Sequence, residues 1–236
     1  MPVSHQVEYT LFTSPSPGIP SINSPEDATK SSKACLPALL PLIPMYDVFL
    51  VACYSQHPLV PQLKHEFEVL QHEATKGSGG RGARKYVTGI FEASVMASLA
   101  LVGATADESF GIVSTGKIWE TSLRDAVRDL LGASDSRRFA GCETTGLNAS
   151  ELHDLPPQEV HQKMKEATKR LLQNGKAAGT NVRAICLGCA GMVGLDDAVR
   201  DACIEELGEG ESKKVAIVDG VKAGVGALLA LSRAGF

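Results

Sequence analysis

Two cysteines of this sequence stand where a thiol could take part in chemistry. Cys53 comes directly after the apolar run at residues 48–52, and Cys189 comes after a second run at 182–187 and a small residue. Both are then followed by a turn that leads toward a helical segment. A thiol at such a place meets backbone N–H groups and the positive end of the helix dipole, which favour the thiolate over an unperturbed pKa of about 8.5. Each cysteine is therefore a candidate acid or base.

Two thiols of this kind could act together if they faced each other across a cleft. One would then be held as thiolate and the other as thiol. Placed on either side of a carbon acid, the thiolate removes a proton and the thiol delivers one to the opposite face. The product is the mirror-image centre, and no cofactor is needed. Taken singly, each cysteine is more readily explained as a buried core residue.

The remaining cysteines fit a packing role, because none follows a complete strand and precedes a glycine-rich turn. These are Cys35, Cys142, Cys186 and Cys203. The spacing Cys186-x-x-Cys189 also occurs in redox and zinc sites. Cys186 lies inside an apolar run, however, and no second Cys or His pair supplies the other zinc ligands. We therefore predict no metal. His57, four residues after Cys53, could reach the strand-end site or could be a solvated residue at the start of a helix.

Alternating strand and helix patterns predict an α/β fold with parallel sheets. Nearly continuous apolar runs predict buried strands. Helical spacing predicts helices ending at Asn174-Gly175, before Gly132 and before Gly208. Ligands of such sheets bind beyond the carboxyl ends of the strands, where both candidate thiols lie. The predicted strands are 48–52, 86–90, 110–113, 182–187 and 215–218, and the helical patterns are 160–171, 123–130 and 198–207.

Composition narrows the class of protein. The 236 residues are 44% hydrophobic and 21% charged, with a net charge of −4 and no basic block, which argues against nucleic-acid or anionic-membrane partners. The most apolar stretch, 34–46, contains three prolines and is too short to span a bilayer. No signal-peptide pattern opens the chain, so we predict a cytoplasmic protein with free thiols and a small-molecule substrate. The glycine-rich residues 76–82 predict a surface loop, and the oligomeric state stays open, a homo-oligomer included.

The segments around the two thiols resemble the Asp/Glu/hydantoin racemase superfamily. Val51-Ala-Cys-Tyr-Ser55 and Leu187-Gly-Cys-Ala-Gly-Met192 are similar to its two catalytic-cysteine segments, and the second is typical of the hydantoin and allantoin racemase branch. Residues 18–27, 89–93 and 218–221 resemble that branch as well. The resemblance implies two similar lobes with four-stranded parallel sheets, an active site between them, no cofactor, and Cys53 and Cys189 as the acid/base pair. We assign 1–92 with 219–236 to the N-terminal lobe and 93–218 to the C-terminal lobe.

The residues after each thiol bear on the substrate. Amino-acid racemases of the superfamily usually carry Asn-Thr or Thr-Glu after the first cysteine and Thr-His after the second. In this sequence, the corresponding residues are Tyr54 and Ser55 after the first cysteine and Ala190 and Gly191 after the second. Small neutral residues in these places would leave room and N–H donors for a flat ring with carbonyl oxygens, such as a 5-substituted hydantoin or allantoin. Thr115, Ser21 and Ser24 are further candidate contacts by family position, with turn formation or capping as the alternative.

One departure from the family pattern concerns the N-terminal lobe. Family members begin with a strand that ends in an Asn-Pro-Asn-like segment, whereas this sequence passes from residues 1–7 into 8–12, which resembles the second strand. We therefore expect the first strand to be missing and the chain as written to be poorly stable or weakly active. The alternatives to a hydantoin-type racemase are an amino-acid racemase or decarboxylase of the same superfamily and a truncated, inactive binding protein.

Overall fold

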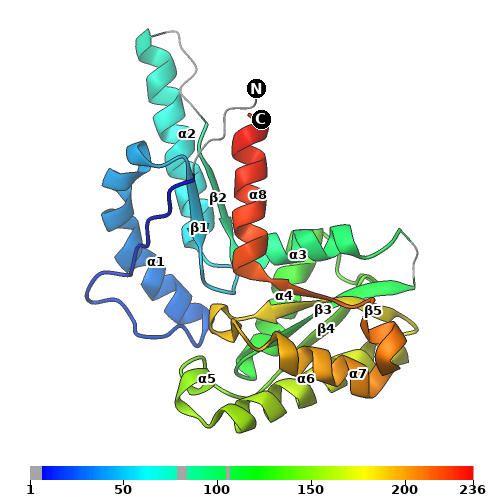
Figure 1. Cartoon of the computed structure of the whole chain (residues 1–236). Coiled ribbons are helices and arrows are strands. Elements are labelled where there is room, and N and C mark those ends of the chain that lie inside the picture. Colours follow the sequence, from blue (N-terminus) through cyan, green and yellow to red (C-terminus); the bar gives the residue numbers. More distant parts are fainter. Residues whose placement is uncertain (1–6, 79–83, 105–106, 236) are drawn as a thin grey trace.

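The computed structural model describes residues 7–78, 84–104 and 107–235, and it is an α/β protein with two parallel sheets (Figure 1). The larger sheet has the strand order β4-β3-β5-β6, and the smaller one pairs β1 with β2. The strands are β1 (Val48–Val51), β2 (Tyr86–Gly89), β3 (Glu108–Ser114), β4 (Phe139–Thr144), β5 (Asn181–Gly188) and β6 (Ala216–Asp219). The predicted α/β fold with parallel sheets flanked by helices is confirmed, but the smaller sheet has two described strands instead of the four expected.

Helices follow the strands in the alternation that the sequence predicts. Among the described helices, none is both long and apolar enough to cross a bilayer. They are α1 (Pro25–Leu39), the 3-10 helix η1 (Leu40–Met45), α2 (Leu59–Ser78), α3 (Ile90–Leu101), α4 (Ile118–Leu131), α5 (Glu151–Asp154), α6 (Pro157–Ala177), the 3-10 helix η2 (Ala190–Met192), α7 (Asp196–Ser212) and α8 (Gly220–Ala234).

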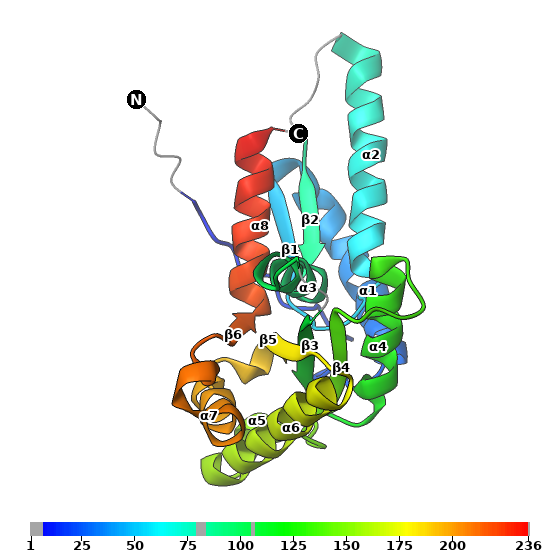
Figure 2. The same ribbon diagram turned by 90° about the vertical axis from the view of Figure 1, so that its right-hand side faces the viewer.

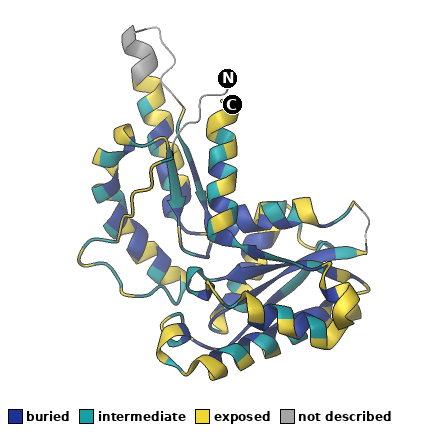
Figure 3. Cartoon of the chain, in the orientation of Figure 1, coloured by how far each residue is buried: buried dark blue, intermediate teal, exposed yellow. Residues whose placement is uncertain are grey.

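The larger sheet is buried on both faces (Figure 3). Because side chains alternate along a strand, β5 contributes Ile185 and Leu187 to the core under α6 and α7, and Ala184 and Cys186 to the core under α3 and α4. Cys186 is fully buried there, as predicted for a packing cysteine. The central strands of this sheet therefore form a rigid support for whatever follows their carboxyl ends.

The smaller sheet is covered by helices from both ends of the sequence. On one face, α1, η1 and α2 form a core with Val51 and Val87. The C-terminal helix α8 returns to contact β1 and β2, and Gly224 of α8 leaves the space into which Leu50 fits. Helix α3 lies between the two sheets, where Figure 2 shows it end-on, and it contacts β2, β5, β6 and α8. This helix thus connects the two parts of the molecule.

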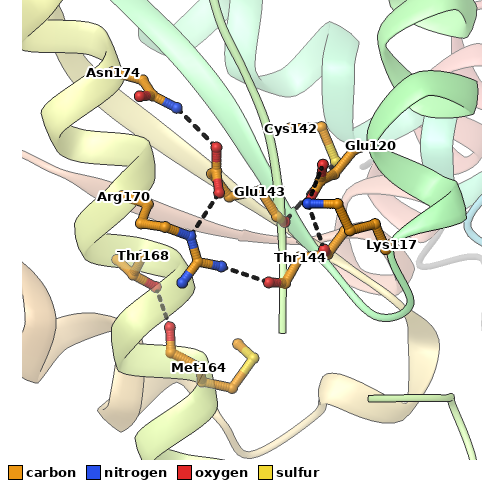
Figure 4. Close-up of polar contacts among 9 residues, drawn as sticks. All are labelled: Lys117, Glu120, Cys142, Glu143, Thr144, Met164, Thr168, Arg170 and Asn174. Carbon is orange, nitrogen blue, oxygen red and sulfur yellow. Dashed lines mark hydrogen bonds and ion pairs between the residues drawn. The ribbon is translucent and has the colours of Figure 1, made fainter. Parts of the chain in front are cut away.

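Strand β4 forms one edge of the larger sheet and is bound by side chains from two helices (Figure 4). Arg170 donates to the Thr144 carbonyl at 2.7 Å and pairs with Glu143 at 2.8 Å. On the other side, the Thr144 hydroxyl donates to Glu120 at 2.7 Å. Unpaired strand edges are sites of unwanted association, so these contacts protect the edge as well as fixing α4 and α6 to the sheet.

Several element predictions need correction. Helix α6 does not end at Asn174-Gly175 but continues to Ala177. Gly175 serves close packing and not termination, because a Cβ there would lie 2.6 Å from Val182 Cγ2. The apolar pattern did not reveal strand β4, whose register with β3 shifts by one residue before Gly141. Gly132 does end α4 in the left-handed conformation, and Gly208 breaks the helical geometry inside α7.

The N-terminal segment also differs from expectation. Residues 8–12 form no strand and are largely exposed, with Leu11 at 96%. An isolated strand is not stable without a paired neighbour, and no described strand pairs with this segment. The loop predicted at 76–82 lies partly outside the described residues, and residues 76–78 belong to α2.

Candidate active site

Both candidate cysteines follow strands of the same local construction. Val51 of β1 pairs with Gly89, the last residue of β2, and Leu187 of β5 pairs with Asp219, the last residue of β6. Cys53 and Cys189 each stand two residues beyond the paired residue. The second strand of each pair then leads directly into a helix, α3 or α8. The two units, β1–β2–α3 and β5–β6–α8, are thus equivalent in connection and register.

Each sulfur interacts with the residue two positions farther along the chain. Cys53 Sγ lies 3.4 Å from Ser55 Oγ, and Cys189 Sγ accepts from the Gly191 N–H at 3.4 Å. Both cysteines are partly exposed, unlike the other four, and all six are free thiols. A hydrogen bond to sulfur stabilises the thiolate, so each strand end provides one polar partner for a charged sulfur.

A charge on the Cys189 sulfur affects the ionisation of Cys53. Burial raises the pKa of Cys53 to about 11, the Ser55 hydrogen bond opposes that rise, and negative charge on Cys189 and Glu92 adds to it. Burial also raises the pKa of Cys189, and the Gly191 N–H opposes it. Since charge on one sulfur makes ionisation of the other harder, the arrangement disfavours two thiolates at once.

The starts of α3 and α8 meet beside Cys189. A Cβ at Gly220 would lie 2.8 Å from the Ile90 carbonyl oxygen, so glycine permits this approach. A small hollow at this point is lined by Cys189, Ala190 and Asp219 together with Ile90 and Gly220. The Asp219 carboxylate already caps α8 by accepting from the Val221 and Lys222 N–H groups at 2.7 and 3.0 Å, so the start of α3 is left to attract a further negative charge.

Glu92 is a site residue that sequence analysis did not single out. It occupies the third position of α3, where hydrogen bonds from the backbone of Glu92 and Gly89 lower its pKa, but burial raises that pKa by more. Its Oε2 is buried without a hydrogen-bond partner, against Gly89, where a Cβ would collide with it. The signal for it was a carboxylate at the capping-box position of a helix that starts at a strand end.

The predicted substrate contacts are distributed unevenly. Ala190 and Gly191 lie beside Cys189, and Ala190 lines the hollow. The Tyr54 side chain is 5% exposed and its hydroxyl lies 2.8 Å from Ser94 Oγ, so it points into the protein rather than toward a ligand. Ser55 is also buried, and its hydroxyl serves Cys53. Around the first thiol, the predicted polar residues therefore support the site from inside.

Thr115, Ser21 and Ser24 have different surroundings in the structure. Thr115 follows β3 and is buried, and its carbonyl accepts from the Gly146 N–H at 3.0 Å. The preceding Ser114 donates to the Gly188 carbonyl at 2.8 Å, which fixes the residue before Cys189. Ser24 caps α1 by accepting from the Asp27 N–H at 3.1 Å, and Ser21 is half-buried. Capping, which was the stated alternative, is what the structure gives Ser24.

Two histidines lie near the thiols in different states. His57 is buried rather than solvated, its Nδ1 accepts from the Leu59 N–H at 3.2 Å, and burial lowers its pKa to about 4. It is therefore neutral near pH 7. His153 of α5 is exposed and its Nε2 would be 3.1 Å from a Cβ on Gly191. Its sequence position, far from either cysteine, gave no indication of this. In the described part of the chain, no group of three potential metal-binding side chains is found.

Comparison with known proteins identifies a family and several relatives to which this chain is similar. The sequence model of the Asp/Glu/hydantoin racemase family matches residues 2–228. A protein of Schizosaccharomyces pombe whose function is uncharacterised is 32% identical over 98% of this chain and 82% of its own length. Protein DCG1 of Saccharomyces cerevisiae is 28% identical over 80% of this chain and 71% of its own length.

Two solved structures share the fold. An allantoin racemase from Klebsiella pneumoniae superposes with a TM-score of 0.66 at 22% identity, over 93% of this chain and 73% of that one. Glutamate racemase RacE1 from Bacillus anthracis gives 0.53 at 13% identity, over 90% and 67%. At these identities the superpositions establish a common architecture.

Proposed function

We propose a function that proceeds from family membership: the chain belongs to the Asp/Glu/hydantoin racemase family and is an isomerase of the racemase type. Its proposed reaction is the interconversion of the enantiomers of a 5-substituted hydantoin or of allantoin. Cys53 and Cys189 are the proposed acid/base pair, and the protein's own side chains suffice for the step. The observation that carries the proposal is the equivalence of the two cysteine-bearing units together with the electrostatic interaction of their sulfurs.

The proposed step moves two protons. A thiolate takes the proton from C5, the ring carbon bonded to the C4 carbonyl and to N1, and the electron pair is delocalised into the C4 carbonyl as an enolate. The opposite thiol then donates its proton to the other face of that carbon. The two sulfurs have exchanged charge states at the end, so the enzyme is ready for the opposite enantiomer and returns by proton exchange with solvent.

The starting charge distribution follows from the surroundings of each sulfur. Cys53 lies near Glu92, whose negative charge opposes a thiolate there. Cys189 receives a backbone N–H and lies beside the starts of α3 and α8. We therefore assign to Cys189 the thiolate that forms more readily and to Cys53 the thiol, so the enantiomer whose proton faces Cys189 reacts from this form.

The substrate class is supported by the small neutral residues beside Cys189. Ala190 and Gly191 are small and neutral, so they place no charged group for an amino acid beside Cys189, and the Gly191 N–H serves the Cys189 sulfur. The start of α3 beside the hollow would stabilise an enolate oxygen. The structural likeness to a protein described as an allantoin racemase agrees with this class. An amino-acid substrate is the alternative to be tested beside it.

Incubation of the protein with enantiopure substrates in D₂O tests the proposal. We expect loss of optical rotation above the spontaneous rate, with deuterium at the inverted carbon, for a 5-substituted hydantoin or allantoin. A matched set of enantiopure aspartate, glutamate and a disubstituted malonate should give no inversion or loss of CO₂. Turnover of the amino acids or malonate alone would replace the hydantoin assignment, and silence on all substrates in a folded sample would favour a binding protein.

A further inference from the structure

A buried polar cluster joins the two segments that carry the candidate thiols. Tyr54 follows Cys53 directly, Ser94 and Ser98 lie one turn apart on α3, and Cys186 lies on β5 three residues before Cys189. Tyr54 Oη is 2.8 Å from Ser94 Oγ, and Ser98 Oγ is 3.1 Å from Cys186 Sγ. All four residues are buried. The cluster thus crosses from the smaller sheet, through α3, to the larger sheet.

The directions of these hydrogen bonds form a consistent set. Ser94 donates its single hydroxyl proton to the Phe91 carbonyl at 2.9 Å, so the Tyr54 hydroxyl must be the donor to Ser94. Cys186 donates to the Ser94 carbonyl at 3.7 Å, which leaves Ser98 as the donor to the Cys186 sulfur. The Tyr54 hydroxyl also interacts with the Cys186 thiol. Each polar group therefore has a defined partner.

Packing alone does not require these polar groups. The Tyr54 ring contacts Phe91 edge-on, with centroids 5.7 Å apart, and the surrounding core residues are apolar. A phenylalanine would make the same ring contact. Burying hydroxyls in such a core is costly unless they are fully bonded, and fully bonded buried networks specify one arrangement of the elements that they join. Here they join the elements on which the two sulfurs depend.

We propose that Tyr54, Ser94 and Cys186 are positioning residues that fix the separation of the Cys53 and Cys189 sulfurs across the two sheets. The proposal rests on the proposed two-thiol reaction. That reaction needs both sulfurs on opposite faces of one carbon atom, and a misplacement of about 1 Å can lower a rate by about 100-fold. Removal of the proton requires only one sulfur, whereas inversion also requires the second sulfur at the correct distance on the opposite face of the carbon.

This difference between one sulfur and two gives the test a specific measurement. In D₂O, a starting enantiomer that is deprotonated and then deuterated on the same face shows exchange without inversion. The Tyr54→Phe and Ser94→Ala variants should raise the ratio of exchange to inversion at least about fivefold, mainly through slower inversion. The double variant should change the ratio no more than the larger single one, because both remove the same hydrogen bond.

Tyr46→Phe is the matched control. The Tyr46 ring also contacts a phenylalanine edge-on, with the same interplanar angle of 79°, but it precedes β1 at the end away from Cys53. This variant should keep the parent ratio. If the test variants lose stability and lower exchange and inversion in equal proportion, the role of the cluster is structural only and the proposal is overturned.

A second measurement does not depend on turnover. A short reagent that bridges two thiols, 1,3-dibromoacetone, should link Cys53 to Cys189 in the parent protein, as identified by peptide mass spectrometry. Tyr54→Phe should lower the yield of that link severalfold, while single alkylation of each cysteine is kept. An unchanged yield contradicts the proposal even if no substrate reacts, whereas parent protein that links well but racemises nothing contradicts only the proposed function.

Discussion

The units β1–β2–α3 and β5–β6–α8 have the same connections and register but very different surroundings. In the larger sheet, β5 has β3 on its other side, and every residue from Ala184 to Gly188 is buried. In the described part of the chain, β1 pairs only with β2, and three of its four residues are just partly buried. The comparison shows that two paired strands and the following helix are enough to present a thiol in this form. The rest of the sheet supplies support.

Support for the smaller unit comes from helices instead of further strands. Buried apolar residues of α1, η1 and α2 cover one face of β1 and β2, and α8 and α3 cover the other. The strand order β4-β3-β5-β6 indicates where β1 would accept another strand, on the edge that corresponds to the β3 side of β5. Variants in each unit can test whether the two units are equivalent in their chemistry, in their stability and in their electrostatics.

Removal of either sulfur should have the largest effect. Cys53→Ala and Cys189→Ala should each lower inversion by about 1,000-fold or more, because a proton donor or acceptor is lost from one face. If the two units are equivalent in mechanism, each variant should still exchange the C5 proton of one enantiomer, and the two variants should prefer opposite enantiomers. Proton NMR in D₂O measures exchange, and polarimetry measures inversion.

Cys203→Ala is the control for this pair, since Cys203 is a buried packing cysteine far along the chain on α7. It should keep both activities in whatever fraction remains folded. Inversion at the parent rate by Cys189→Ala would remove the two-thiol mechanism, and the same preferred enantiomer in both variants would show that the sulfurs do not face opposite sides of the substrate.

Stability should distinguish the two units next. Leu171→Ala opens the core of the larger sheet, where the leucine fills the space over Gly111, and should cost about 4 kcal/mol of unfolding free energy. Leu63→Ala, in the core that α1, η1 and α2 form over the smaller sheet, should cost about 2 kcal/mol of unfolding free energy, because helices can move inward more easily than strands in the centre of a sheet. Urea unfolding measures both values.

Hydrogen exchange separates a local effect from a global one in these variants. Leu63→Ala should speed exchange of the β1 and β2 amides while leaving β5 protected, whereas Leu171→Ala should affect all strands. Equal acceleration everywhere in both variants would mean that the smaller sheet does not open on its own.

The sequence contained enough to predict the units but not their surroundings. Cys53 and Cys189 were identified because a continuous apolar run marks a buried parallel strand and its end marks a ligand site. Glu92 and His153 were missed, since the capping-box position of Glu92 indicates a helix start rather than a site, and His153 lies far from either cysteine in the sequence. Tyr54 was expected to face a ligand, because position next to a catalytic residue does not determine the direction of a side chain.

Close approach of the two helices gives a smaller effect. Gly220→Ala would place a Cβ 2.8 Å from the Ile90 carbonyl oxygen, so it should push α8 from α3 and cost about 2 kcal/mol. Gly226→Ala, on an exposed turn of the same helix with no atom within 4 Å of the new Cβ, should stabilise by about 0.5 kcal/mol. Opposite signs in thermal unfolding would show that the helix starts are fitted to each other, and equal signs would contradict that.

Electrostatics should give the smallest effect and the finest contrast between the units. Glu92→Gln removes a negative charge that raises the pKa of Cys53, so that pKa should fall from about 11 while burial keeps it above the usual range. The Cys53 thiolate then forms at lower pH, and the pH profile of its alkylation by iodoacetamide should move toward acid. Cys189 receives no such charge effect from Glu92, so its profile should stay in place. Equal displacement of both profiles would mean that the carboxylate acts on the whole site, and displacement of neither would mean that Glu92 is already protonated by burial, as the rise in its own pKa allows.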